Sequence, residues 1–448
     1  MLKMIQDLQQ ELAASKTQQQ QTSEKLEALK SQLEENTASV KKVSQETKQV
    51  RKDTEDVQRQ VVANNVTLAS DPPPNSPAGL TVMPFPNALF HMGGYATANY
   101  RATTGDEDRA GKINSFLGAQ FNPVFHFTYK DFLLAEAELE FEVGDDGETE
   151  VDLEYASIDW LATNWLTFVA GSFLSPVGFW QQNLHPTWIN KLPDPPAGWG
   201  HHGIAPLNDL GVMARGGFGK VGHPLLNYGV YVGNGPQLEF EDGNLAHLGQ
   251  GSFGLDDNND KAVGGRIGIV PIPYLEIGGS FEVAQVQGQR NVGPAEDVSG
   301  PVTDGQYTLW GVDAGYTMDP WNIRGEYIHA ELDSFWSQAH VEDGEPVHTM
   351  LIPANEWSAW YAQVAYRLSK LNNPILQNVE FVGRYGQVRA SGFEHFVEHA
   401  GPEDETTIGL NYWFSSSAVF KSAVSWKDFT AEDNIDATVY RAQFAYGF

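Results

Sequence analysis

From Ala88 onward the sequence divides into segments of about ten residues in which apolar and polar side chains alternate. Such alternation places the two kinds of side chain on opposite faces of a β-strand. The connections alternate too, because short turns follow even-numbered segments and long acidic or Gly/Pro-rich loops follow odd-numbered ones. An even number of strands joined in this way predicts a closed antiparallel barrel. The sixteen expected strands are residues 89–101, 115–129, 132–143, 151–161, 165–173, 209–219, 224–234, 262–270, 275–286, 307–318, 321–331, 356–368, 378–389, 406–414, 418–427 and 437–448.

The two faces of these strands predict what surrounds the barrel. Ala135–Val143 carries four glutamates on one face and apolar side chains on the other. So many neighbouring carboxylates are too costly for a dry core, so we expect the polar face to line a wet lumen and the apolar face to meet lipid. Closure of the barrel also removes unpaired strand edges, which hydrocarbon does not tolerate. Aromatic residues near strand ends are expected in two interfacial girdles. They are Tyr129, Phe132, Trp160, Trp165, Trp310, Trp321, Trp357, Trp413 and Trp426.

The N-terminal segment has a different pattern. Residues 1–65 contain no Gly, Pro or aromatic residue, and one heptad register runs through them without interruption. The core positions of this register are Ile5, Leu8, Leu12, Ser15, Gln19, Thr22, Leu26, Leu29, Leu33, Asn36, Val40, Val43, Thr47, Val50, Thr54, Val57, Val61 and Asn64. The pattern predicts a left-handed coiled coil roughly 90 Å long, and β-branched residues at both core positions favour three strands. A disordered polar tract is the alternative, because residues 18–21 are all glutamine.

Three regions follow from these patterns. Residues 1–70 form the coiled coil, residues 71–87 a Pro-rich linker, and residues 88–448 the barrel. No run of 18 apolar residues occurs, so no transmembrane helix is expected. The fold class is therefore an all-β transmembrane barrel of 16 antiparallel strands, preceded by an α-helical trimeric coiled coil.

Composition excludes several classes of function. The chain has 28 Lys+Arg and 58 Asp+Glu, a net charge of −30, which argues against a nucleic-acid partner. It has no cysteine, which excludes disulfides, thiolate metal sites, cysteine nucleophiles and covalent c-type haem. Most acidic residues cluster in the long loops. These loops would either attract cations to a channel mouth and hold surface divalent cations that bridge to anionic glycolipid, or simply form a solvated surface.

The C-terminal strand ends in Phe448, on the same face as Tyr440, Phe444 and Tyr446. With the strand count, the loop alternation and the coiled coil, this aromatic end resembles the trimeric outer-membrane porins. The N-terminal rod is similar to that of DcaP-type porins. The resemblance covers residues 88–448 and implies a homotrimer in the outer membrane of a Gram-negative bacterium. It also implies contact with lipid and lipopolysaccharide, and a periplasmic coiled coil that could reach peptidoglycan.

The connection 174–208 is the longest in the barrel and is stiffened by six prolines. In sixteen-stranded porins the third external loop narrows the lumen, so the resemblance implies that this loop forms the constriction. An external lid or a trimer contact is the alternative. The candidate constriction residues are Trp180, Gln181, His185, Trp188, Lys191, Asp194, Trp199, His201 and His202.

Charged residues on the lumen-facing side of the strands form the candidate pore wall. The basic ones are Arg101, Arg215, Arg266, Arg324, Arg367, Arg384, Lys421 and Arg441. The acidic ones are Glu136, Glu138, Glu140, Asp152 and Glu154, on two neighbouring strands. Acid and base are thereby separated around the wall, which would create a transverse field that orients dipolar solutes. The alternative is that these charges only hydrate a wet interior.

Three apparent motifs are discounted. The sequence GFGKVG at 217–222 matches a dinucleotide fingerprint but lies in a hairpin with no following helix. The sequence DDNND at 256–260 lacks the glycine and the final glutamate of a calcium loop. His201 and His202 are adjacent on a loop, a spacing that rarely suits one metal ion. We therefore expect no metal site and no cofactor.

We expect a water-filled channel for passive diffusion of small hydrophilic solutes and ions, with a weak cation preference. One alternative is a barrel that acts as a sheath or anchor for an envelope or electron-transfer complex. Another is an outer-membrane hydrolase, but His329 and Asp333 lie at one rim without a positioned nucleophile, so no enzyme activity is expected.

Overall fold

The computed structural model describes residues 80–85, 87–105, 114–144, 147–201, 203–219, 225–241, 244–249, 260–288, 301–339, 348–392, 402–429 and 435–448. The predicted coiled coil, most of the predicted linker and His202 lie outside these residues. Within the described part of the chain, no helix combines the length and apolarity needed to cross a membrane.

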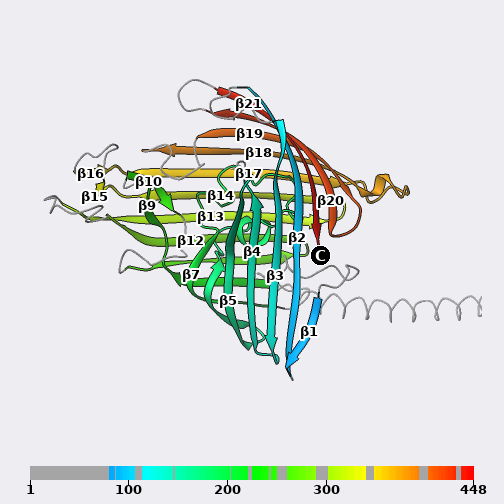
Figure 1. Cartoon of the computed structure of the whole chain (residues 1–448), viewed down its shortest axis with the longest axis horizontal. Helices are drawn as coiled ribbons and strands as arrows, with labels where there is room; N and C mark the ends of the chain where they lie inside the picture. The colour runs from blue at the N-terminus through cyan, green and yellow to red at the C-terminus, as the bar shows by residue number, and fades with distance from the viewer. Residues whose placement is uncertain are drawn as a thin grey trace, which may run out of the picture. The chain divides into compact units, whose positions relative to one another are not determined.

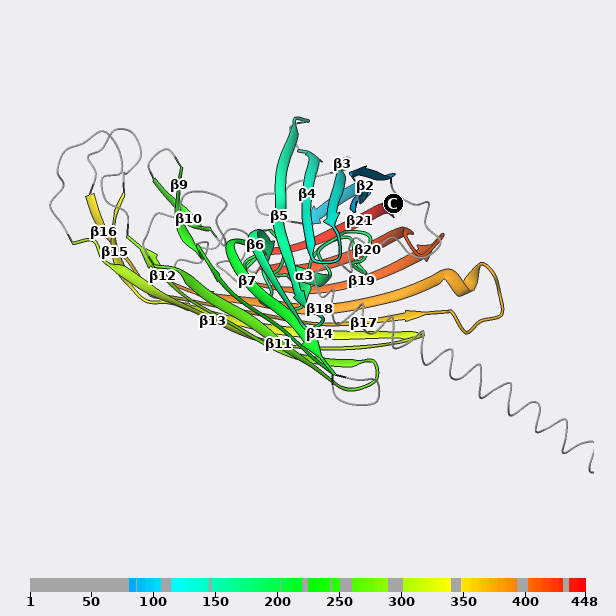
Figure 2. The ribbon, with the colours of Figure 1, turned by 90° about the horizontal axis from the view of Figure 1, so that it is seen from below.

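Sixteen of the described strands close into an antiparallel barrel (Figure 1, Figure 2). They are β2 (Ala88–Gly105), β3 (Asn114–Tyr129), β4 (Leu133–Val143), β5 (Thr149–Thr163), β6 (Leu166–Leu174), β7 (Asn208–Phe218), β8 (Leu225–Gly233), β11 (Ala262–Ile272), β12 (Leu275–Gln287), β13 (Asp304–Met318), β14 (Trp321–Leu332), β17 (Asn355–Arg367), β18 (Val379–Ser391), β19 (Glu403–Trp413), β20 (Ala418–Phe429) and β21 (Ile435–Gly447). Each pairs with the next, and β21 pairs with β2 from Tyr95↔Gly447 to Gly105↔Ala437. The prediction of a closed sixteen-stranded barrel is confirmed.

Several short elements were not predicted, because they lack a long alternating pattern. β1 (Leu80–Phe85) pairs with β2 and uses residues expected in the linker. The hairpins β9 (Gln237–Glu241) with β10 (Asn244–Gly249) and β15 (Phe335–Ala339) with β16 (His348–Ile352) form in long loops. Within the described residues, the helical elements are α3 (Trp180–Asn183) and the 3₁₀ turn η1 (Leu376–Asn378).

The outer face of the barrel is apolar, as the alternation predicts. Ile267 and Ile408, near the middle of β11 and β19, are 55% and 58% exposed. Trp160, Trp165, Trp310, Trp321 and Trp426 are also exposed on this face. The girdle assignment is wrong for Trp357 and Trp413, which are buried inside the barrel. The alternation of side chains along β17 and β19 points both of these tryptophans into the barrel. Nearness to a strand end therefore does not by itself place a tryptophan outside.

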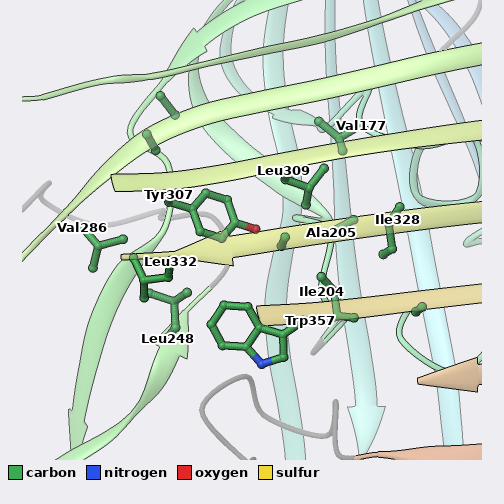
Figure 3. Packing of buried hydrophobic residues seen from close by; sticks show 14 of the residues in the cluster. Val177, Ile204, Ala205, Leu248, Val286, Tyr307, Leu309, Ile328, Leu332 and Trp357 are labelled. Atoms are coloured by element: carbon green, nitrogen blue, oxygen red, sulfur yellow. The ribbon is translucent and has the colours of Figure 1, made fainter. Parts of the chain in front are cut away.

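The lumen is not uniformly wet. Tyr307, Leu309, Ile328, Leu332 and Trp357 point inward from β13, β14 and β17 and form a packed apolar cluster (Figure 3). The long loop after β6 and the hairpin β9–β10 cover this cluster with Val177, Ile204, Ala205 and Leu248. The expectation of a polar inner face is therefore wrong for this region, because loop side chains exclude water from it.

Candidate functional site

The connection between β6 and β7 enters the barrel and crosses its lumen. At its start, the backbone N–H groups of Phe179 and Trp180 donate to the carboxylate of Glu326 on β14, the latter at 3.2 Å. The Tyr361 hydroxyl on β17 donates to the same carboxylate at 3.1 Å. Glu326 is 4% exposed, so this buried carboxylate accepts three bonds that hold the loop against the wall.

The second half of the loop is bonded to strands that follow β14 around the wall. The Lys191 ammonium lies 2.8 Å from Glu380 on β18. Lys421 on β20 donates to the carbonyl of Thr187 in the loop. Asp194 accepts two bonds from Arg441 on β21, at 2.8 and 3.0 Å. The loop is thus bonded to inward side chains along the run of strands from β14 to β21.

Backbone carbonyls of the loop add a further contact. The Arg384 guanidinium on β18 donates to the carbonyls of Asp194 and Pro195, at 3.0 and 2.8 Å. The same guanidinium lies 3.5 Å from Glu405 on β19. Prolines in the loop leave few alternative backbone conformations, so these bonds hold a pre-formed shape.

Gln181 and His185 stabilise the loop from within. The Gln181 amide donates to the carbonyls of Gly200 and Ala205 and accepts from the N–H of Gly200. His185 Nδ1 lies 3.0 Å from the carbonyl of Gln181. Burial, together with the nearby His201, lowers the pKa of His185 to about 4, so its ring is neutral at pH 7. Both predicted constriction residues therefore hold the loop's own fold.

Of the three predicted tryptophans of the loop, Trp180 and Trp199 both belong to the apolar cluster, and Trp180 also lines a cavity with Trp188. Trp199 packs edge-to-face on Tyr361, with ring centroids 4.9 Å apart, inside the apolar cluster. Trp180 and Trp188 line a cavity of about 270 Å³ between the loop and the wall. The other lining residues are Leu184, Ile189, Asn190, Lys191, Asn322, Arg324, Tyr361, Gln363 and Trp413. The cavity combines aromatic faces with amides and two cations, a lining that suits a polar organic solute.

Among the described residues, four of the eight predicted basic wall residues pair with carboxylates: Arg215, Arg266, Arg384 and Arg441. Arg266 on β11 bonds Asp313 at 2.7 and 2.8 Å and Glu276 at 3.1 Å. Arg215 on β7 bonds Asp159 on β5 and lies 3.9 Å from Glu136. Alternation along one strand does not predict these partners, because each ion pair joins different strands or a strand and the loop, and Arg215–Asp159 and Arg266–Asp313 each span an intervening strand.

The remaining basic wall residues have weaker or different contacts. Arg324 stacks on Phe179 at 3.9 Å from its ring centroid, and among the described residues no carboxylate lies within ion-pair distance of it. Arg367 donates to Asn378 of η1 and lies 5.7 Å from the Trp413 ring centroid. Arg101 is half-buried and lies opposite Arg441 in the β2–β21 register.

The predicted acidic residues on β4 face inward. Glu138 accepts a bond from the Tyr95 hydroxyl at 2.8 Å, and Glu136 lies 3.1 Å from His126. A register shift after Glu138 makes Glu154 an extra, unpaired residue of β5. This bulge shifts by one residue the positions of β5 whose side chains point inward. Glu154 and Asp159 are therefore both buried, while Asp152 is exposed.

Acid and base are not separated around the wall as predicted. Buried or half-buried carboxylates also occur outside β4 and β5, on strands for which no acidic wall residue was predicted. They are Asp209, Glu276, Glu282, Asp313, Glu326, Glu380, Glu403 and Glu405. Among the described residues, the contacts of Glu138, Glu140 and Glu154 are with polar side chains and His201, and no ion pair joins these three carboxylates to an arginine or lysine. The wall therefore has local ion pairs and one acidic region rather than two opposed halves.

His201 lies against this acidic region. Its Nε2 atom is 3.2 Å from Glu154 Oε1 and 3.7 Å from Glu140 Oε2. The His201 side chain is 53% exposed, whereas the two carboxylates are buried. The loop thus ends its crossing of the lumen with an imidazole beside two carboxylates.

No protein-family model matches the chain, and no curated protein matches it. Among solved structures, the anion-selective porin from Comamonas acidovorans is similar with a TM-score of 0.51 and 10% identity, over 81% of this chain and 100% of that chain. The outer membrane channel DcaP of Acinetobacter baumannii matches with a TM-score of 0.48 and 12% identity, over 83% and 100% of the two chains. A trimer form of OmpT, an outer membrane protein of Vibrio cholerae, matches with a TM-score of 0.45 and 13% identity, over 81% and 100%.

The comparison with the Comamonas porin shows that the fold is that of a porin barrel. The other two TM-scores lie below 0.5, so the fold assignment rests on the first. The expected resemblance to outer-membrane porins is confirmed at the level of the fold.

Proposed function

We propose that the chain is an outer-membrane porin that conducts small hydrophilic solutes and ions by passive diffusion. The observation that carries this proposal is the loop over residues 175–207. It is bonded to β14, β18 and β21 on one side of a sixteen-stranded barrel and meets Glu154 of β5 on the other. A barrel of this size encloses more space than its own wall side chains fill. A stiff loop across that space sets the narrowest cross-section, and no covalent chemistry is needed.

The cavity beside the loop indicates where a solute would be held. Lys191 of the loop lies 5.0 Å from the Trp413 ring centroid on β19, and Arg324 on β14 stacks on Phe179 of the loop, so cation–aromatic contacts join the loop to the wall here. Asn322 and Gln363 supply amide groups on the same side. Such a lining gives short-lived hydrogen bonds and stacking contacts, which permit passage without tight retention.

The assembly is part of the same proposal. Residues 1–70 would form a trimeric coiled coil in the periplasm, joining three barrels and reaching toward peptidoglycan. The apolar outer face of the barrel supports contact with lipid, and the acidic loops would face lipopolysaccharide and divalent cations. Deletion of residues 1–70 should lower the trimer fraction in detergent while leaving the barrel folded.

Planar-bilayer recording of the purified protein tests the proposal directly. We expect stepwise conductance in multiples of three, and a reversal potential in a salt gradient that reports a weak cation preference. A protein that inserts but stays closed would contradict a porin. Such a result would favour the sheath or anchor function, and stoichiometric capture of an envelope partner would then identify that function.

A further inference from the structure

His201, Glu140 and Glu154 bring three metal-ligating groups together inside the barrel. One nitrogen and two carboxylate oxygens lie within 4.8 Å of one another. A divalent ion bound at about 2.1 Å from each ligand in tetrahedral geometry separates its ligand atoms by about 3.4 Å. The separations of 3.2 and 3.7 Å from His201 Nε2 to the two glutamates fall on either side of this value.

Glu154 gives independent support for a bound cation. Its side chain is 2% exposed, and neither of its oxygens accepts a hydrogen bond within the described part of the chain. Burying a carboxylate without such bonds costs several kcal/mol, and no arginine or lysine of the described residues lies within ion-pair distance of it. Asp159, by contrast, has Arg215 as its partner. A divalent cation would supply the missing positive charge.

The surroundings of the cluster also fit a metal site. Gln120 donates to Glu140 Oε1 at 2.6 Å, which leaves Oε2 directed at His201. Outer contacts of this kind orient ligating carboxylates. The exposed edge of His201 provides an entry path and room for water as a further ligand. An imidazole with carboxylates suits Zn²⁺, Co²⁺ or Mn²⁺ rather than Ca²⁺ or Mg²⁺, which take oxygen ligands.

We propose that Glu140, Glu154 and His201 form a binding site for a divalent transition-metal ion, with Zn²⁺ as the fitting species. The bound ion joins the loop over residues 175–207 to strands β4 and β5, so it fastens the end of the loop to the wall. This proposal does not require the barrel to conduct, because it concerns binding alone.

Titration of the full-length, tag-free protein in detergent with Co²⁺ and Zn²⁺ tests this site. Excess Ca²⁺ and Mg²⁺ would occupy the acidic loops. We expect one Co²⁺ per chain with a ligand-field spectrum that Zn²⁺ abolishes. His201→Ala and Glu154→Gln should each weaken Zn²⁺ binding about 100-fold, and Gln120→Ala about 10-fold. Glu276→Gln and His329→Ala remove the same groups elsewhere and should leave binding unchanged.

A second measurement uses only the wild-type chain, in case the variants fail to fold. Diethyl pyrocarbonate labels exposed imidazoles, and saturating Zn²⁺ should protect His201, whose side chain is 53% exposed, by at least tenfold. Absence of saturable Co²⁺ binding, unchanged affinity in both ligand variants, or unprotected labelling of His201 would each overturn the proposal.

Discussion

Glu326 offers the sharpest test of how the loop is held. Its carboxylate accepts the N–H groups of Phe179 and Trp180 and the hydroxyl of Tyr361. Each hydrogen bond to a charged group contributes about 1.5–3 kcal/mol, so the two backbone bonds together contribute about 3–6 kcal/mol. In Glu326→Ala, water that enters the vacated space can bond the freed N–H groups and so recovers part of this free energy. We therefore expect a loss of about 3 kcal/mol in the free energy that opens this segment, or on the order of 100-fold in its opening equilibrium.

Hydrogen exchange read by mass spectrometry measures that opening. The peptide containing Phe179 and Trp180 should exchange on the order of 100-fold faster in Glu326→Ala, since exchange of buried amides follows local opening. Single-channel current should become noisier and larger, because the start of the loop leaves the wall. Glu276→Gln is the matched control, as it removes a wall carboxylate bonded to Arg266 instead of the loop. Equal exchange in Glu326→Ala and wild type would refute this account of the anchor.

Three further perturbations follow from the same structure. Lys191→Met leaves Glu380 buried without its cation and should lower the free energy of unfolding by about 3 kcal/mol, measured by urea unfolding with tryptophan fluorescence. The double variant Lys191→Met/Glu380→Gln should lose less stability than Lys191→Met alone. Equal losses in the two variants would contradict a coupled pair. Ile267→Arg places a charge on the exposed outer face and should lower the free energy of unfolding in liposomes by about 2–4 kcal/mol. Ile267→Leu should leave that free energy unchanged. An arginine variant as stable as the wild type would argue against lipid contact at this position. Removal of residues 1–70 should convert trimers to monomers in analytical ultracentrifugation, and intact trimers would place the trimer contact in the barrel.

The strand count was predictable because lipid on one side and a polar interior on the other force a period of two on every strand. Ala135–Val143 shows this, since its glutamates are found inside and its apolar residues outside. The closing pair β2–β21 was also predictable, because a membrane barrel cannot leave a strand edge open. The bounds of the loop at residues 174 and 208 agree with the ends of β6 and β7.

The hydrogen-bond and ion-pair partners of the site residues were much less predictable. Glu326 looked like an ordinary inward residue, and only the path of the loop shows that two of its backbone amides meet this carboxylate. Asp159 was missed because the bulge at Glu154 shifts parity by one residue, and no local pattern marks a bulge. The burial of Trp357 has a similar cause, since what covers it comes from residues more than a hundred positions away in sequence.

The sequence alone determined the barrel, its strand number and the place of its longest loop, because these follow from local periodicity and from the solvents on its two faces. The tertiary structure decided where that loop lies and which charges it meets. It brought His201 to Glu140 and Glu154 and bonded Asp194 to Arg441, 247 positions away. Contacts of such separation depend on how a closed barrel folds its loop inward, and side-chain alternation carries no information about that path.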